Sequence, residues 1–328
     1  MRLGVIVAAV IGLALATAVA AWVGFGALFA ALSRVGWRGL VVLCAYSALP
    51  LCLLGTAWYA IAREERLGRW PTFIWARWVR DSAGELLPFS HLGGFVIGAR
   101  AAIERGVSST VAFSTTVVDI TTELIAQLGF IGVGLGLLVM RLGAKTSESA
   151  LVEAALIGLV MSAVGAAAFI ALQRRGGGLV ERMISRFLPG AAAGTGRVIA
   201  AIDAIYHNPV RIAGAVLLHL LAWIASAVGV WLALRLAGVR IGLSSILAIE
   251  ALVGAVRSAA FVAPMGIGVQ EASYALLGPL FGLGPELSLA VSLLKRGRDL
   301  VVGVPALLAW QGLEGMRLLN REAGEEAN

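Results

Sequence analysis

The chain has 328 residues, of which 59% are hydrophobic and 14% are charged, and its mean hydropathy is +0.91. This much apolar side-chain area exceeds what a water-soluble core buries, so the composition excludes a soluble domain and predicts an integral membrane protein. The formal net charge of +7 is typical of basic cytoplasmic loops that face anionic lipid head groups, and we expect no nucleic acid partner.

Long apolar runs recur along the chain, and most of them reach the roughly 20 residues that a helix needs to cross a bilayer. The runs are 3–25, 40–62, 107–140, 151–172, 210–234, 244–263 and 285–310. None alternates like the strands of a membrane barrel, so the predicted fold is all-α and polytopic. We expect a single transmembrane domain over 1–328, with a first half at 1–172, a basic cytoplasmic connector at 173–209 and a second half at 210–311.

Basic residues indicate the side of the membrane on which each loop lies, because Lys and Arg concentrate in cytoplasmic loops. The Arg-rich segments 63–80 and 173–211 are therefore predicted to be cytoplasmic. The aromatic residues of 63–80 predict a helix at the membrane interface, with its Arg side chains among the lipid phosphates. With both termini inside, the chain makes about six full crossings and two re-entrant hairpins, at 81–100 and 244–283.

Two apolar stretches are interrupted in the same way, about 177 residues apart. Arg80 precedes Pro88 by eight residues, Arg257 precedes Pro264 by seven, and glycines follow each Pro. The charge-based topology has the two segments entering the membrane from opposite sides. Matching helix breaks of this kind are typical of inverted repeats that build a site near the midplane, so we predict two inverted repeats. The alternative is a chance alignment of the small residues that membrane helices commonly contain.

Charged side chains within apolar runs are the first candidate functional residues, because a charge at membrane depth is costly. Asp119 and Glu123 lie four residues apart on one helical face, where they could share a proton, bind a head-group amine or pair with an Arg. The segment Lys295–Asp299 contains three cations and one acid. The excess of positive charge predicts an anionic ligand such as a phosphate, and the alternative is a salt bridge to Asp119 or Glu123.

Other polar residues flank the two breaks. Glu250 lies seven residues before Arg257 on the same helical face, and Gln270 and Glu271 follow a glycine-rich turn. A helix that starts at such a turn presents N–H groups that favour an anion. His91 has no second His near it in the sequence, so we expect no metal site.

No enzyme motif occurs in the chain, and we predict neither a catalytic residue nor a cofactor. The candidate substrate-binding residues are Arg80, Glu85, His91, Asp119, Glu123, Arg257, Gln270, Glu271, Arg296, Arg298 and Asp299.

Four segments have the pattern of a known family: Gly84–Pro88, Gly106–Asp119, Ala263–Ala272 and Ala290–Arg296. In these segments the chain resembles the flippase-like superfamily named after the transmembrane region of lysylphosphatidylglycerol synthases. The longer run Trp75–Arg100 is similar to the hopanoid-biosynthesis-associated branch. The resemblance implies a multi-pass protein of the bacterial inner membrane that moves or exports lipid, without an aminoacyl-transferase domain.

The expected function is therefore translocation or export of a lipid through a midplane cavity between the two hairpins. The expected substrate is a hopanoid or an anionic phospholipid, and the protein partners to consider are a second copy of the chain and proteins of a lipid pathway. A hopanoid is neutral or carries a polar side chain, so it does not explain the excess of Arg. The alternatives are a membrane-embedded enzyme that modifies a lipid head group, with Glu271 and His91 as its best pair, and a scaffold that does not transport.

Overall fold

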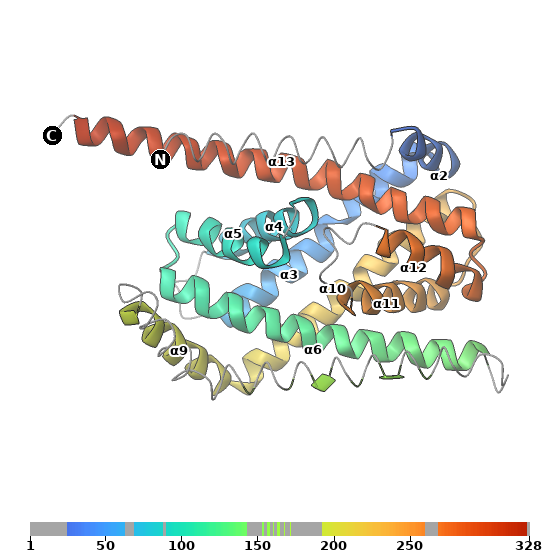
Figure 1. The fold of residues 1–328 in the computed structure, drawn as a ribbon, viewed down its shortest axis with the longest axis horizontal. Helices are drawn as coiled ribbons and strands as arrows, with labels where there is room; N and C mark the ends of the chain where they lie inside the picture. Colours follow the sequence, from blue (N-terminus) through green and yellow to red (C-terminus); the bar gives the residue numbers. More distant parts are fainter. Residues whose placement is uncertain are drawn as a thin grey trace.

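The computed structural model describes residues 25–62, 69–87, 90–142, single positions between 153 and 171, 192–259 and 268–326. These residues are mostly helical and contain no strand, which confirms the predicted all-α class. The long helices α6 and α13 run along opposite sides of the molecule, and two pairs of shorter helices, α4 with α5 and α11 with α12, lie between them (Figure 1).

The helices of the first half are α2 (Phe25–Tyr46), α3 (Ala48–Ile61), α4 (Trp70–Leu86), α5 (Ser90–Glu104) and α6 (Ser109–Leu142). Those that follow are α9 (Ala192–Tyr206), α10 (Pro209–Leu236), α11 (Leu243–Ala259), α12 (Val269–Leu277), the short 3₁₀ helix η4 (Gly278–Phe281) and α13 (Pro285–Glu326).

Three helices in the described part of the chain are long and apolar enough to cross a membrane, judged by length and composition. They are Val35–Ile61, Ser109–Arg141 and Pro209–Leu236. The last two confirm the apolar runs 107–140 and 210–234 to within two residues. The first runs from α2 into α3, and it begins at Val35 instead of the predicted residue 40.

The remaining crossings stay predictions. The run 3–25 lies outside the described residues, and only single helical positions are described within 151–172. The run 285–310 forms part of α13, whose charged segment Lys295–Asp299 makes it too polar to count by composition alone. That helix also continues to Glu326 instead of ending near residue 310, because the following residues are rich in helix formers such as Leu, Glu and Arg.

The first predicted break is a helix end in the structure. Helix α4 ends at Leu86, Leu87 is extended with φ −101° and ψ 139°, and α5 begins at Ser90. An extended residue is what a following Pro imposes. Helix α5 then packs closely along α4, because Gly98 has no Cβ. A Cβ at Gly98 would lie 2.6 Å from the Cβ of Arg80.

The second break separates α11, which ends at Ala259, from α12, which begins at Val269. Residues 260–267, including Pro264, lie outside the described ones. Gly268 precedes α12 with φ +78°, and its N–H donates to the Glu271 carboxylate at 2.8 Å. Both breaks thus divide the chain into paired helices, while their re-entrant path through a membrane and the inverted repeat stay predictions.

Buried side chains from both halves pack together. One apolar cluster joins Leu43 of α2 and Leu138 of α6 to Val230 of α10, Ile249 of α11 and Leu294 of α13. This packing holds α6 of the first half against α11 of the second, and α4 contacts α13.

Helix α4 covers residues 70–80 of the segment that the sequence placed at a membrane interface, and that placement stays a prediction. Phe73 and Val79 are fully buried, and the side chains of Arg77 and Arg80 are only 3% exposed. The prediction that these two Arg side chains lie among lipid phosphates is therefore wrong. Their partners are carboxylates of α6.

Candidate functional site

A cavity of about 500 Å³ lies between the helices of the two halves. Apolar and small side chains of α3, α5 and α10, such as Leu51, Phe95 and Trp223, form part of its wall. The rest of the wall includes five cations and five carboxylates: Arg77, Arg80, Asp81, Glu85, Glu123, Glu250, Arg257, Lys295, Arg298 and Asp299. The cavity therefore has many charged groups but no excess of either sign.

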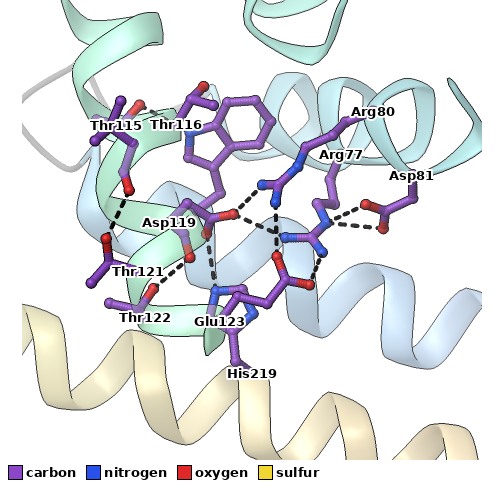
Figure 2. A network of polar contacts seen from close by, with 12 residues as sticks. Arg77, Arg80, Asp81, Thr115, Thr116, Asp119, Thr121, Thr122, Glu123 and His219 are labelled. Atoms are coloured by element: carbon purple, nitrogen blue, oxygen red, sulfur yellow. Dashed lines mark hydrogen bonds and ion pairs between the residues drawn. The ribbon is translucent and has the colours of Figure 1, made fainter. Parts of the chain in front are cut away.

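The first-half wall is a network in which two cations of α4 meet two carboxylates of α6 (Figure 2). Arg77 donates from Nη1 to Asp119 Oδ2 at 2.9 Å and from Nη2 to Glu123 Oε1 at 2.6 Å. Arg80 donates to the same Asp119 oxygen and, at 2.8 Å, to Glu123 Oε2. Arg77 also contacts Asp81 on its own helix at 2.8 Å. The network joins α4 to α6 and satisfies charges that would be costly alone.

Helical periodicity places these groups on facing surfaces. On α4, Arg80 and Asp81 follow Arg77 by three and four residues, so all three lie on one face. On α6, Glu123 follows Asp119 by four residues and lies on the same face. The neighbouring threonines of α6 donate to carbonyls of their own helix: Thr115, Thr116, Thr121 and Thr122. Their hydroxyl donors are thus used within the helix, which leaves the two carboxylates to accept from the Arg side chains.

His219 of α10 completes this network from a third helix (Figure 2). Its Nε2 lies 3.0 Å from Asp119 Oδ1, and both side chains are fully buried. The carboxylates converge on Arg77 and Arg80, and the imidazole contacts Asp119, so these groups do not surround an empty centre. In the part of the chain that the structure describes, no three His, Cys, Asp or Glu side chains are placed to hold a metal ion.

A second buried group joins three helices of the second half. Lys295 of α13 donates to Glu250 Oε2 of α11 at 2.6 Å, and the hydroxyl of Tyr274 in α12 donates to the other oxygen of that carboxylate. The Lys295 ammonium also lies 5.4 Å from the centre of the Tyr274 ring. Lys295 and Glu250 are 7% and 8% exposed, so this ion pair is part of the interior.

One ion pair at the cavity joins the two halves directly. Arg257 of α11 donates to both oxygens of Glu85 in α4, at 2.9 and 2.8 Å, and its other nitrogen donates to Gln270 at 3.1 Å. These two charged side chains are 23% and 29% exposed, more than those of the other cross-helix pairs that line the cavity. Nearby, Arg296 contacts Glu271 at 3.1 Å, and Arg298 contacts the adjacent Asp299.

The expected excess of cations is wrong. Among the described residues, six cations in and beside the cavity face seven carboxylates: Arg77, Arg80, Arg257, Lys295, Arg296 and Arg298 against Asp81, Glu85, Asp119, Glu123, Glu250, Glu271 and Asp299. Counting within 295–299 could not find Glu250 or Glu271, which lie on other helices. At the start of α12, the Glu271 carboxylate takes the place of the predicted anionic ligand, because it accepts from the Gly268 N–H.

The predicted site residues differ in their position relative to the cavity. Those that line the cavity are Arg80, Glu85, Glu123, Arg257, Arg298 and Asp299. Asp119 lies behind this wall, and Gln270, Glu271 and Arg296 form an adjoining group in which Gln270 also donates to Ser292. His91 is in the first turn of α5, and its side chain lies outside what the structure describes.

Two residues of this site, Arg77 and His219, are absent from the sequence-based candidates, and Glu250 and Lys295 are absent from the substrate-binding set although their charge within apolar runs marks them. The rule that selected Asp119, a polar group inside an apolar run, would also have selected His219 in 210–234. Arg77 was assigned to an interfacial helix by its Trp and Arg neighbours. No local signal shows that α6 carboxylates lie opposite.

These features define a helical membrane protein with a charged, electrically balanced interior cavity. Residues 7–306 match the family described as "Lysylphosphatidylglycerol synthase TM region", and the chain belongs to this family. No curated protein and no solved structure matches the chain. The family confirms the resemblance seen in the sequence and makes this a membrane protein with a lipid-related function, without distinguishing the hopanoid branch.

Proposed function

We propose that the protein translocates a lipid across the bacterial inner membrane, with the head group passing through the cavity between the two halves. The observation that carries this proposal is the cavity itself, whose walls come from both halves and hold ten charged side chains. Charges at membrane depth are retained where they serve a polar passenger or a transport step. A volume of about 500 Å³ lies within the roughly 300–1,000 Å³ of ordinary ligand pockets.

The balance of charge favours a head group with no net charge. Each cation of the wall already has a carboxylate partner, so no anion is needed to neutralise it. Hydroxyl groups can donate to the carboxylates and accept from the guanidinium groups without separating the pairs. A phosphate would instead have to displace a carboxylate. A hydroxylated hopanoid fits this chemistry better than an anionic phospholipid, and the excess of Arg no longer argues against it.

The Glu85–Arg257 pair offers the sharpest test, because it joins the halves and is partly exposed to the cavity. The protein is reconstituted in phosphatidylcholine vesicles that contain either a fluorescent polyhydroxylated triterpenoid or fluorescent phosphatidylglycerol. A quencher added outside the vesicles reports how much of the fluorescent lipid is in the outer leaflet, and its change with time measures translocation. We expect wild-type protein to move the uncharged lipid faster than protein-free vesicles do. Glu85→Gln leaves the Arg257 cation without this carboxylate and should shift the preference toward phosphatidylglycerol.

Glu286→Gln is the matched control, because it removes one carboxylate from an exposed position in the first turn of α13. It should translocate like wild type. If wild-type protein moves neither lipid, the proposed function is wrong. If Glu85→Gln and Glu286→Gln keep the same lipid preference, the assignment of the cavity as the head-group path is wrong. Lipids recovered with a changed mass would support the enzyme alternative.

A further inference from the structure

His219 combines three properties that a purely structural residue does not need together. It is fully buried, its Nε2 contacts the equally buried Asp119, and its second ring nitrogen, Nδ1, is buried without a hydrogen-bond partner. Buried polar atoms are nearly always paired, so an orphan atom calls for an explanation. In a neutral imidazole that donates to Asp119 from Nε2, this orphan Nδ1 is the nitrogen without a proton.

The charge of the network points to the same residue. With a neutral imidazole, the two cations Arg77 and Arg80 face three carboxylates, those of Asp81, Asp119 and Glu123, which leaves one net negative charge. Asp119 and Glu123 are the more buried carboxylates, whereas Asp81 is 33% exposed and water screens part of its charge. One proton on His219 brings the network to neutrality.

The other elements around α10 meet it mainly through apolar side chains, and the ionisable groups among them are tyrosines, Tyr206 of α9 and Tyr46 of α2. Near the His219 turn, α3 and α9 contribute apolar side chains such as Ile61 and Ile202, which pack around Ala215. Helices α2 and α11 meet later turns of α10 through apolar contacts that include Val230. The charged groups that face His219 are therefore those of α6 and α4. Among these groups Arg does not release its proton, whereas the imidazole of His219 has a second nitrogen, Nδ1, that can accept one.

We propose that His219 binds and releases one proton in each transport cycle, so that lipid translocation is coupled to a proton gradient. The inference rests on the proposed function and adds its energy source. The link to the lipid runs through Arg77 and Arg80, which contact Asp119 on one side and line the cavity on the other. Glu123 also lines the cavity, one helical turn from Asp119, and offers a polar route to the pair. Loss of the proton thus changes the charge that this wall presents to a head group.

The test measures lipid and protons together. Wild-type protein is reconstituted in phosphatidylcholine vesicles that contain a pH-sensitive dye. The distribution of the fluorescent triterpenoid between the two leaflets is measured with and without a gradient of one pH unit. For one proton per lipid, that gradient supports about a tenfold difference between leaflets, which a protonophore should abolish. His219→Gln keeps an N–H donor for Asp119 but cannot carry the proton, and it should lose both the gradient dependence and the proton flux.

His207→Gln is the control, because His207 is 71% exposed and contacts only Asp203 among the ion pairs of the structure's described residues. It should behave as wild type. Translocation by the wild type that ignores the gradient, or gradient dependence that persists in His219→Gln, would overturn this inference while leaving the proposed function intact. Absence of wild-type translocation would overturn both.

A second measurement decides the matter if His219→Gln does not fold. The chain contains three His, so ¹⁵N-histidine NMR of the folded wild-type protein resolves few imidazole signals, and His207→Gln assigns one of them. A buried imidazole that changes protonation between pH 5 and 9, in the range where His ordinarily titrates, supports the proposal. A buried imidazole that keeps one state over this range overturns it.

Discussion

The replacement of Arg77 by Met tests whether the α4–α6 network holds the fold together. Met keeps much of the side-chain volume and removes the charge, so the change isolates the ion pairs. In the wild type, Arg77 contacts Glu123 at 2.6 Å, Asp81 at 2.8 Å and Asp119 at 2.9 Å. After the replacement, Arg80 is the one network cation left to face three carboxylates.

The expected loss follows from the exposure of each partner. Asp81 is 33% exposed, so water screens its pair with Arg77 and that contact contributes little. The Asp119 and Glu123 side chains are 0% and 19% exposed, and removing one partner of such a buried pair costs about 3–5 kcal/mol. A proton taken up by His219 would offset part of the unpaired negative charge. We therefore expect a loss near the lower limit, about 3 kcal/mol.

The assay is the free energy of unfolding in mixed detergent micelles, followed by loss of helical signal as the denaturing detergent is increased. Arg197→Met is the matched control, because Arg197 lies exposed on α9 and should change stability by no more than about 0.5 kcal/mol. A loss below about 1 kcal/mol for Arg77→Met would show that the buried contacts do not hold α4 on α6.

Two further predictions use the same unfolding assay. Gly98→Ala should lower the free energy of unfolding by about 1–3 kcal/mol, because the new Cβ would lie 2.6 Å from the Cβ of Arg80. Gly136→Ala is the control: its Cβ would point into open space, and it should change stability by no more than about 1 kcal/mol. Similar losses for both variants would contradict the close α4–α5 packing. Lys295→Met and Glu250→Gln should each cost about 3 kcal/mol or more, and the double variant less than their sum, because the two buried groups neutralise each other. Strictly additive losses would show that the two side chains do not interact.

The parts of the fold that could be predicted are those that depend on local chain properties. Continuous apolar runs predicted α6 and α10 closely, because a helix in a membrane satisfies its own backbone hydrogen bonds whatever its neighbours are. Pro88 predicted the end of α4, because Pro restricts the residue before it. Asp119 and Glu123 were recognisable because carboxylates are rare in such runs.

The errors share one cause. Composition alone places Arg77 among lipid phosphates, because a helix rich in Trp and Arg can lie either at a membrane interface or inside a protein where acids match the Arg charges. The excess of cations in Lys295–Asp299 disappeared because the acids that match them, Glu250 and Glu271, are 45 and 25 residues away in the chain. Local counting of charge cannot include a partner that the fold supplies.

Hydropathy and residue type along the chain are enough to show that the protein is helical, lies in a membrane and carries charged groups at unusual depth. Which charges meet is a property of the folded chain. It paired Arg77 and Arg80 with α6, brought His219 to Asp119, and joined Glu85 of one half to Arg257 of the other. Ion pairing depends on distances between helices, and those distances are set by the packing of small and apolar side chains rather than by spacing in the sequence.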